Sequence, residues 1–505
     1  MRVAFILIAL SFLAFPVSAH DDHIHRALDA NDTCPVDLPD WATPSETYAW
    51  VRICTGQIAN MNFATGANDN AGCDAPDETE KWPEQRQLSA RFIKLISTRA
   101  PYIDAPARPE VRIRCAVVPD RIDLDYEVIP QALWITHSRL QEGLTVVNAQ
   151  FGSDLSLWGS ALGNAGLYAT GLSVDGDLYL SWGQFSFVYL IHAKIAGHLI
   201  AEGSEFSENF SAIRISVAGD LDLGGEGQFA GIDLRDARIG HSLWLGSWFG
   251  GEVDLSGAVI GELMLTDWEV GVAWRAGARL DLSNATAKSL FAWMPESWMR
   301  EDDSRLPIKM SGFRYDRLGD LTGRIPRNLE LIDTPALIEW LQAPLPDGLD
   351  QYPEYAPGYA PQPYQQLEAT LRGMGAEEPA DEVANARHLH RMATRGDNWL
   401  GWSGDLALRW LVGFGLHPFR VLWWFGGLVV LGWAVARWCS ALRPKGLADC
   451  GWYSLENALP LVELSQDHQA VRHENVWVRS FFHFQKVTGF LLATVLVGAL
   501  TLLGG

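Results

Sequence analysis

Basic residues are scarce in this chain of 505 residues, which has 39 Lys and Arg against 61 Asp and Glu and a formal net charge of −22. Proteins that bind nucleic acids need clustered positive charge to meet the phosphate backbone. The acidic balance therefore argues against a nucleic-acid partner. The length is sufficient for two or three domains.

The sequence also lacks the short motifs that mark common catalytic sites. It has no Walker loop, no G-x-S-x-G, no H-E-x-x-H and no C-x-x-C. Two glycine-rich stretches, 159–166 and 224–231, miss the G-x-G-x-x-G spacing and precede no helix that would hold a pyrophosphate. We therefore assign no cofactor and no catalytic residue, and the chain resembles a binding protein more than an enzyme.

Cysteine is also infrequent, with six in the whole chain. Two of them, Cys439 and Cys450, lie near the C-terminus. The other four lie in the N-terminal segment, at Cys34, Cys54, Cys73 and Cys115. Four cysteines in an oxidising compartment indicate two disulfide bonds, for which three pairings are possible. A metal site is the alternative, but no two of these cysteines have the C-x2-C spacing of zinc sites.

The first residues have the pattern of a secretory signal peptide. Met1-Arg2 is a short basic start, residues 3–17 are apolar, and Val17-Ser18-Ala19 has small residues at the spacing that signal peptidase requires. We expect residues 1–19 to be removed and the mature chain to begin in the periplasm. An uncleaved membrane anchor is the alternative, and it leaves the following domain on the same side of the membrane as a cleaved signal peptide would.

A tandem repeat occupies residues 122–290. Triplets of the form apolar, variable, apolar recur every 20 to 23 positions, and a second set lies about half a period later. The first set begins at Leu133, Leu155, Leu178, Leu199, Leu221, Leu243 and Leu263. Each triplet is typical of a short strand with one buried face, and the fixed period is typical of a solenoid. We predict a β-helix with two strands per coil. A leucine-rich repeat is the alternative, but it needs helical arcs and an Asn ladder that are missing here.

Glycines recur shortly before the triplets of the first set. They are Gly176, Gly197, Gly219, Gly240 and Gly261. Because glycine tolerates a positive φ, we predict that these residues form left-handed corners of the coils.

The middle residue of each triplet is expected to point outwards, so residues one coil apart stack into a column on the surface. In the first set this column reads Trp134, Ser156, Tyr179, Ile200, Asp222, Trp244 and Met264. A contiguous apolar strip usually marks a covered surface. The candidates for partner binding are therefore Trp134, Tyr179, Ile200, Trp244 and Met264. The covering element is either the chain's own segment after residue 290, or an envelope protein or second copy.

Two groups of residues are weak candidates for binding a metal ion. In the second set of triplets, Asp233 and Asp254 should stack about 5 Å apart, where a cation such as calcium would relieve their repulsion. Water and salt do the same at an exposed site. The second group is His20, His23 and His25 at the expected mature N-terminus, where mobile termini favour adventitious binding.

Residues 20–121 contain the four cysteines and are expected to cap the first coil, as solubility of a solenoid requires. A helix start signal is present, with Thr43 as N-cap, Pro44 at the first helical position and Glu46 three residues after the cap. After the repeat, residues 291–362 are predicted to be irregular and to end in a Pro-rich linker. Residues 363–396 are predicted to form a hairpin of two helices around Gly373-Met374-Gly375.

The region after the linker resembles a known family of bacterial membrane proteins. The resemblance rests on Tyr364-Gln-Gln-Leu367, Leu371-Arg372, Gly375, Ala386-Arg387, Arg391 and the stretch from Leu411 to Pro418. These residues are similar to the junction in pentapeptide-repeat-type membrane proteins, which join a right-handed β-helix to two C-terminal membrane helices. The resemblance covers residue 122 to the C-terminus. Some members are labelled membrane-associated oxidoreductases, but no residue of this chain supports redox chemistry, so we expect the architecture without that activity.

Two apolar stretches, 419–436 and 487–503, are long enough to cross a bilayer. If the β-helix is exported, the first span runs from outside to inside and the loop 437–486 is cytoplasmic. Basic residues in that loop agree with the positive-inside rule: Arg437, Arg443, Lys445, Arg472, Arg479 and Lys486. The whole topology inverts if the N-terminal segment is not exported.

Within the loop, residues 452–462 are amphipathic, and we expect a helix that rests on the inner leaflet. Its position is similar to that of the pore helix in two-helix cation channels, but the T-V-G-Y-G carbonyl ladder of those channels is missing. The sequence thus predicts a binding or scaffolding protein of the cell envelope, anchored in the cytoplasmic membrane with its β-helix in the periplasm. An oxidoreductase with a site not visible in sequence and a channel-like pore are the alternatives.

Overall fold

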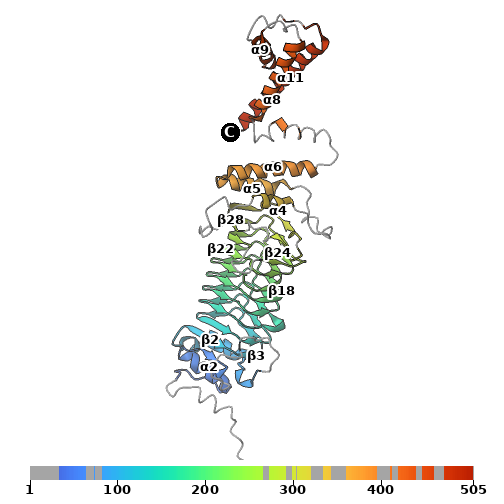
Figure 1. Cartoon of the computed structure of the whole chain (residues 1–505). Helices are drawn as coiled ribbons and strands as arrows, with labels where there is room; N and C mark the ends of the chain where they lie inside the picture. The colour runs from blue at the N-terminus through green and yellow to red at the C-terminus, as the bar shows by residue number, and fades with distance from the viewer. Residues whose placement is uncertain are drawn as a thin grey trace, which may run out of the picture. The chain divides into compact units, whose positions relative to one another are not determined.

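The computed structural model describes residues 33–63, 73, 82–265, 272–291, 298–302, 304–319, 334–342, 360–394, 406, 410–411, 419–439, 446–459, 471 and 473–503. The chain divides into two compact units, Met1–Ala376 and Glu377–Gly505. We call them the solenoid unit and the C-terminal unit. Figure 1 shows the stacked strands of the first and the helices of the second.

The solenoid unit confirms the predicted β-helix. Its coils stack in parallel, so that Leu133 pairs with Leu155, and Leu155 with Leu178, as the spacing of the triplets indicated. These leucines point inwards and are completely buried. The first sheet continues through β6 (Ala132–Thr136), β10 (Leu155–Ser156), β13 (Leu178–Tyr179), β17 (Leu199–Ile200), β20 (Leu221–Asp222) and β22 (Arg238–Trp244).

Several coils contain four short strands, where the sequence had predicted two. In one coil, β13 is followed by β14 (Gln184–Phe185), β15 (Val188–Tyr189) and β16 (Lys194–Ile195). A strand of two residues is too short to show the alternation that identifies a strand, so these sides of the coil were missed. In the sequence, each of these additional strands was marked only by a single buried residue per coil. On one side these residues stack as rings, with centroids 4.8 to 5.5 Å apart: Phe185, Phe206, Phe229, Phe249 and Trp274.

The predicted reason for the recurrent glycines is wrong. None of Gly176, Gly197, Gly219, Gly240 and Gly261 has a positive φ. Glycine is needed there because the neighbouring coil is too close: a Cβ on Gly240 would lie 2.2 Å from the carbonyl oxygen of Ala218. The left-handed corners come two residues after most of the triplets. In the first set they are His137, Gly159, Trp182, Gly203 and Gly225.

The stacked strands extend past both predicted limits of the repeat. At the start, β1 (Ala59–Asn60) pairs with β2 (Glu110–Arg114), which pairs with β6. At the end, β28 (Thr286–Phe291) pairs with β30 (Arg314–Leu318), and β29 (Ile308–Lys309) extends the second sheet. The segment predicted to be irregular, 291–362, therefore contributes two strands and the helix α4 (Thr334–Gln342).

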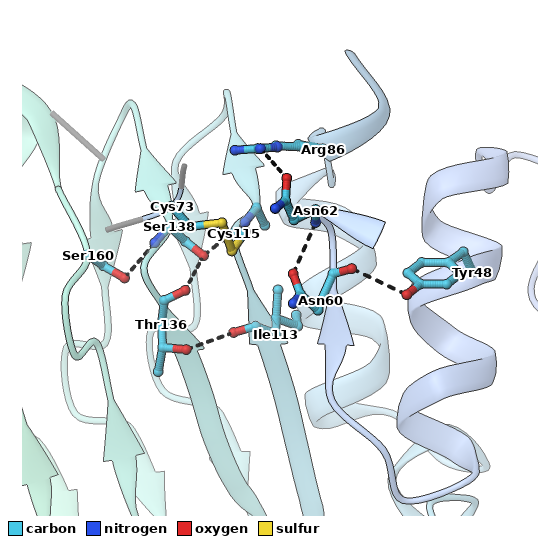
Figure 2. The surroundings of a disulfide bond; sticks show 11 residues. Tyr48, Asn60, Asn62, Cys73, Arg86, Ile113, Cys115, Thr136, Ser138 and Ser160 are labelled. Carbon is cyan, nitrogen blue, oxygen red and sulfur yellow. Dashed lines mark hydrogen bonds between the residues drawn. A yellow bond between two sulfur atoms is a disulfide. The ribbon is translucent and has the colours of Figure 1, made fainter. Parts of the chain in front are cut away.

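The N-terminal segment contains α2 (Pro44–Cys54) and α3 (Ala90–Thr98). The helix start signal is confirmed, because the Glu46 N–H donates to Thr43 Oγ1 at 3.2 Å and the Thr43 N–H donates to Glu46 Oε2 at 2.8 Å. The disulfides join Cys34 to Cys54 and Cys73 to Cys115, which selects one of the three pairings. Figure 2 shows that the second bond lies at the first coils of the solenoid, beside Ser138.

The helix α5 (Pro361–Gly373) supplies side chains to the last strand, β30. The Gln366 side-chain amide donates to the carbonyl oxygen of Tyr315 at 2.7 Å, and Thr370 Oγ1 donates to the same oxygen at 3.0 Å. One turn earlier, Gln362 donates to the carbonyl oxygen of Phe313 at 2.8 Å. Three residues spaced by four thus satisfy carbonyls at a strand edge that would otherwise be open to another chain.

Replacing Gln366 with leucine is expected to destabilise this end of the solenoid by about 0.5–1.5 kcal/mol, because the Tyr315 carbonyl loses one of two side-chain donors and keeps Thr370. Gln365, next to it, is exposed, so Gln365→Leu is the matched control. Urea unfolding and sedimentation of the detergent-purified protein measure the loss of stability and any edge-to-edge association. Equal behaviour of the two variants would contradict the role given to Gln366.

The C-terminal unit contains α6 (Glu377–Thr394), α8 (Arg420–Cys439), α9 (Leu447–Ala458) and α11 (Val476–Leu503). The stretches Arg420–Trp438 and Val476–Gly498 are long and apolar enough to cross a membrane, and only 22% of the residues in the most apolar window of each are buried. Both predicted spans thus lie in helices, the second of which begins earlier than predicted. The two helices of the predicted hairpin also form, but α5 belongs to the solenoid unit and α6 to the C-terminal unit.

Candidate functional site on the first sheet

The candidate binding residues stand in one column on the outward side of the first sheet. The pairing runs from Arg112 to Trp134, Ser156, Tyr179, Ile200, Asp222, Trp244, Met264 and Phe291 without a break. We call this set the aromatic column. Its stacking confirms the register predicted from the spacing of the triplets.

Exposure divides the column into two parts. Trp134, Tyr179, Ile200 and Trp244 are half-buried, whereas Met264 is only 3% exposed. Met264 is therefore not available to a partner, and its place among the predicted binding residues is corrected. The reason is its position near the end of the solenoid, where the outward side of the sheet is covered: Phe291, its neighbour in the next coil, is also buried at 6%.

Neighbouring side chains of the column cover part of one another. The Trp134 and Tyr179 rings lie two coils apart, yet their centroids are 6.2 Å apart because the residue between them is the small Ser156. The Arg112 guanidinium lies 5.0 Å from the centre of the Trp134 ring, within range of a cation–π interaction. The rings are thus held in place before any partner arrives, which limits the entropy lost on binding.

A second column, formed by the residue immediately before each triplet, lies beside the first and is polar. Its members are Asp154, Asp177, His198, Asp220 and Ser242, which we call the polar column. The His198 N–H donates to Asp177 Oδ1 at 2.7 Å, and the Asp220 N–H donates to His198 Nδ1 at 3.0 Å. The Asp177 and Ser242 N–H groups donate in the same way to the preceding aspartates, at 2.9 Å each.

The polar column satisfies backbone donors next to the closely packed glycines. Sequence reasoning missed it, although the repeated pairs Gly176-Asp177, Gly197-His198 and Gly219-Asp220 were its signal. It also fixes one member of the aromatic column, because the Tyr179 hydroxyl donates to Asp177 Oδ2 at 2.7 Å. Burial, and then the hydrogen bond to Asp177, raise the pKa of Tyr179 to about 12. The phenol therefore stays neutral and can offer a partner its ring and its hydroxyl oxygen.

The second face carries the predicted acidic stack, which the chain neutralises with its own cations. Asp233, Asp254 and Asp281 pair in successive coils, followed by Lys309. Arg235 donates two hydrogen bonds to Asp233, at 2.8 and 2.6 Å, and lies 3.7 Å from Asp254. Lys309 lies 3.1 Å from Asp281. Burial is the first cause of a raised pKa at Asp254, and the two neighbouring aspartates add to it.

The repulsion that suggested calcium at Asp233 and Asp254 is thus relieved by Arg235. Within the described residues, no group of three or more His, Cys, Asp or Glu has an arrangement that could hold a metal ion. The other candidate ligands, His20, His23 and His25, lie outside the described residues.

The first sheet therefore offers half-buried aromatic rings, held in register and bordered by a row of side chains that are already hydrogen-bonded to the backbone. Such a surface suits recognition by contact, because its polar groups are already hydrogen-bonded and its rings keep part of their area exposed. No family model, no curated protein and no solved structure matches the chain.

Proposed function

We propose that the chain is a binding or scaffolding protein of the bacterial cell envelope and that the aromatic column is its contact surface. The observation that carries the proposal is the unbroken register of Trp134, Tyr179, Ile200 and Trp244 on the outward side of one sheet. Tyr and Trp give large contact areas with few rotatable bonds and dominate the energy of many protein interfaces. The partner is an envelope protein or a second copy of the chain.

The proposed location is the cytoplasmic membrane, with the solenoid unit in the periplasm. Two disulfides support an oxidising compartment, and the two long apolar helices support a membrane anchor. The predicted signal peptide, 1–19, lies outside the described residues. Positive charge between the two helices supports an orientation with that loop in the cytoplasm.

The N-terminal segment is proposed to close the first coil. The Gln131 side-chain amide donates to the carbonyl oxygen of Ile96 at 3.1 Å, and Lys94 lies 3.2 Å from Glu127. Both contacts join α3 to the first coil of the repeat. A solenoid followed by two long apolar helices also agrees with the architecture that the pentapeptide-repeat-type resemblance implies, and membership of that family remains a proposal.

The test is the double variant Tyr179→Ser with Trp244→Ser in the full-length protein. We expect association, measured by crosslinking in membranes and by sedimentation in detergent, to weaken at least about tenfold, because truncation of a central aromatic residue commonly removes more than 1.4 kcal/mol. The circular-dichroism spectrum should not change.

Trp182→Ser is the matched control, since Trp182 lies in the same coil as Tyr179 and is 51% exposed at a corner instead of on the sheet. This variant should keep the wild-type crosslinks. If the double variant folds and keeps every crosslink of the wild type, the aromatic column is not the contact surface.

A further inference from the structure

We propose that a groove on the side of the coils formed by β14 binds a linear oligosaccharide of N-acetylated sugars. The groove is separate from the aromatic column, so the proposal does not depend on that surface. Its volume is about 460 Å³, which is within the range of small-molecule sites. We call it the amide groove, and side chains from four successive coils line it: Arg139, Gln141, Asn164, Gln184, Ser186 and Glu205.

Unequal coil lengths create the amide groove. In one coil, two residues, 186–187, join β14 to β15. In the next coil, β18 (Glu205–Ser211), labelled in Figure 1, has three residues, 207–209, over the same span and forms a bulge there. In the preceding coil, four residues, 163–166, fill this span and include the short helix η4 (Gly163–Ala165). The shortest of the three coils is thus recessed between two longer ones.

The floor and one wall of the amide groove are held in place by contacts between coils. Phe185 is only 3% exposed below the groove, and its ring stacks on that of Phe206 with centroids 5.2 Å apart. The Ser186 hydroxyl donates to the carbonyl oxygen of Gly163 at 2.7 Å, which fixes the recessed coil to η4. Because the groove is already formed, a ligand loses little free energy in ordering it.

Three primary amides in the groove are available to a ligand. Within the part of the chain that the structure describes, the side chains of Gln141, Asn164 and Gln184 make no hydrogen bond. Each has two N–H donors and a carbonyl acceptor, so it can form two hydrogen bonds with the N–H and carbonyl of an acetamido group. The groove therefore differs from the polar column, where side chains are already bonded to the backbone.

The ring of Trp182 provides a flat surface at the corner two residues before Gln184. A Cβ on Gly203 of the next coil would lie 2.8, 2.9 and 2.9 Å from three adjacent ring carbons, so one face of the ring lies on that glycine. The other face is open, since Trp182 is 51% exposed. Aromatic faces are partly negative, whereas the C–H bonds on a face of a sugar ring are partly positive. Trp182 is therefore suited to stack on a sugar ring.

Charge and strand pairing favour an oligosaccharide over other polymers. Arg139 and Glu205 lie in the first and last of the four coils, so the groove has charges of both signs and does not select a polyanion. A peptide that adds a strand needs an open sheet edge. Here Gln184 of β14 pairs with Glu205 on one side and with Ala161 on the other. The ligand is therefore recognised by side chains.

The test is isothermal titration calorimetry of the full-length protein with chitotetraose, a linear tetramer of N-acetylglucosamine. Lauryldimethylamine oxide keeps the protein in solution, because this detergent has no sugar head group. We expect one-site binding that weakens at least about tenfold in Trp182→Ser and in Asn164→Ala combined with Gln184→Ala. Asn209→Ala is the control, because Asn209 is exposed on the β18 bulge and does not line the groove. It should keep the wild-type affinity.

Absence of binding by the wild-type protein would overturn the proposal, as would unchanged affinity in both groove variants with wild-type circular-dichroism spectra. Two further probes test the class of ligand. Cellotetraose, which lacks acetamido groups, should bind at least about tenfold more weakly, and tetraalanine should not bind. Equal affinity for either would overturn the assignment to N-acetylated sugars. Trp182→Ser should lose the sugar and keep the crosslinks of the aromatic column, so the two surfaces are tested independently.

Discussion

Removing the disulfide between Cys73 and Cys115 by serine substitution of both residues is expected to lower the free energy of unfolding by about 4 kcal/mol. The bond closes a loop with a sequence separation of 42, and the loss of loop-closure entropy in the unfolded chain predicts this magnitude. The bond also makes a connection within the folded structure. It attaches Cys73 to Cys115, a buried residue at a left-handed corner of the first coils.

Cys34→Ser with Cys54→Ser provides the comparison, because that bond closes a loop with a separation of 20 and should contribute about 3 kcal/mol. The two loops do not overlap in sequence, so their effects should add in the quadruple variant. Urea unfolding of the detergent-purified protein, followed by its β-sheet circular-dichroism signal, measures both. A larger loss from the shorter loop would show that chain entropy is not the main contribution.

Gly240→Ala is expected to destabilise the solenoid by about 3 kcal/mol, although alanine is the smallest possible change that adds a Cβ. The added atom would lie 2.2 Å from the carbonyl oxygen of Ala218. That carbonyl cannot withdraw easily, because the Ala218 N–H is bonded to Ile195 of the coil before it at 3.0 Å. Relief of the clash would require two coils to separate, which weakens the ladder between them.

Gly250→Ala is the control for this prediction. A Cβ at Gly250 would lie 3.7 Å from the carbonyl oxygen of Phe229, which is an ordinary contact, and Gly250 has no positive φ. This substitution should change stability by less than about 1 kcal/mol, in either direction. Thermal unfolding of both variants by circular dichroism distinguishes them. Similar midpoints would mean that close approach of the coils does not explain the recurrent glycines.

Several features were predictable because their signal lies within a short stretch of chain. The period of the leucine triplets fixed the register of the first sheet, and with it the column from Trp134 to Trp244. The capping box at Thr43 and Glu46 needs only four consecutive residues. The two long apolar helices are visible from composition alone. In each case, local periodicity or spacing contains the physical information that selects the structure.

Other features depended on contacts between residues far apart in sequence. The pairing of the cysteines, the burial of Met264 and the contacts of α5 with β30 each require the position of a second segment. The position of Arg235 also depends on tertiary structure, and its guanidinium takes the place of the metal cation that Asp233 and Asp254 had suggested. The same is true of the reason for the recurrent glycines. The sequence around these glycines is equally compatible with a positive φ and with close approach of the neighbouring coil.

The sequence by itself thus determined that this chain forms stacked coils with an outward aromatic column and carries two helices apolar enough for a membrane. Only the tertiary structure decided that several coils have four strands, that a polar column borders the aromatic one, and that α9 packs against both α8 and α11. The physical reason is the range of the interactions. Burial patterns repeat along the chain and can be read locally, whereas the distance between two coils or two helices is set by every residue that packs between them.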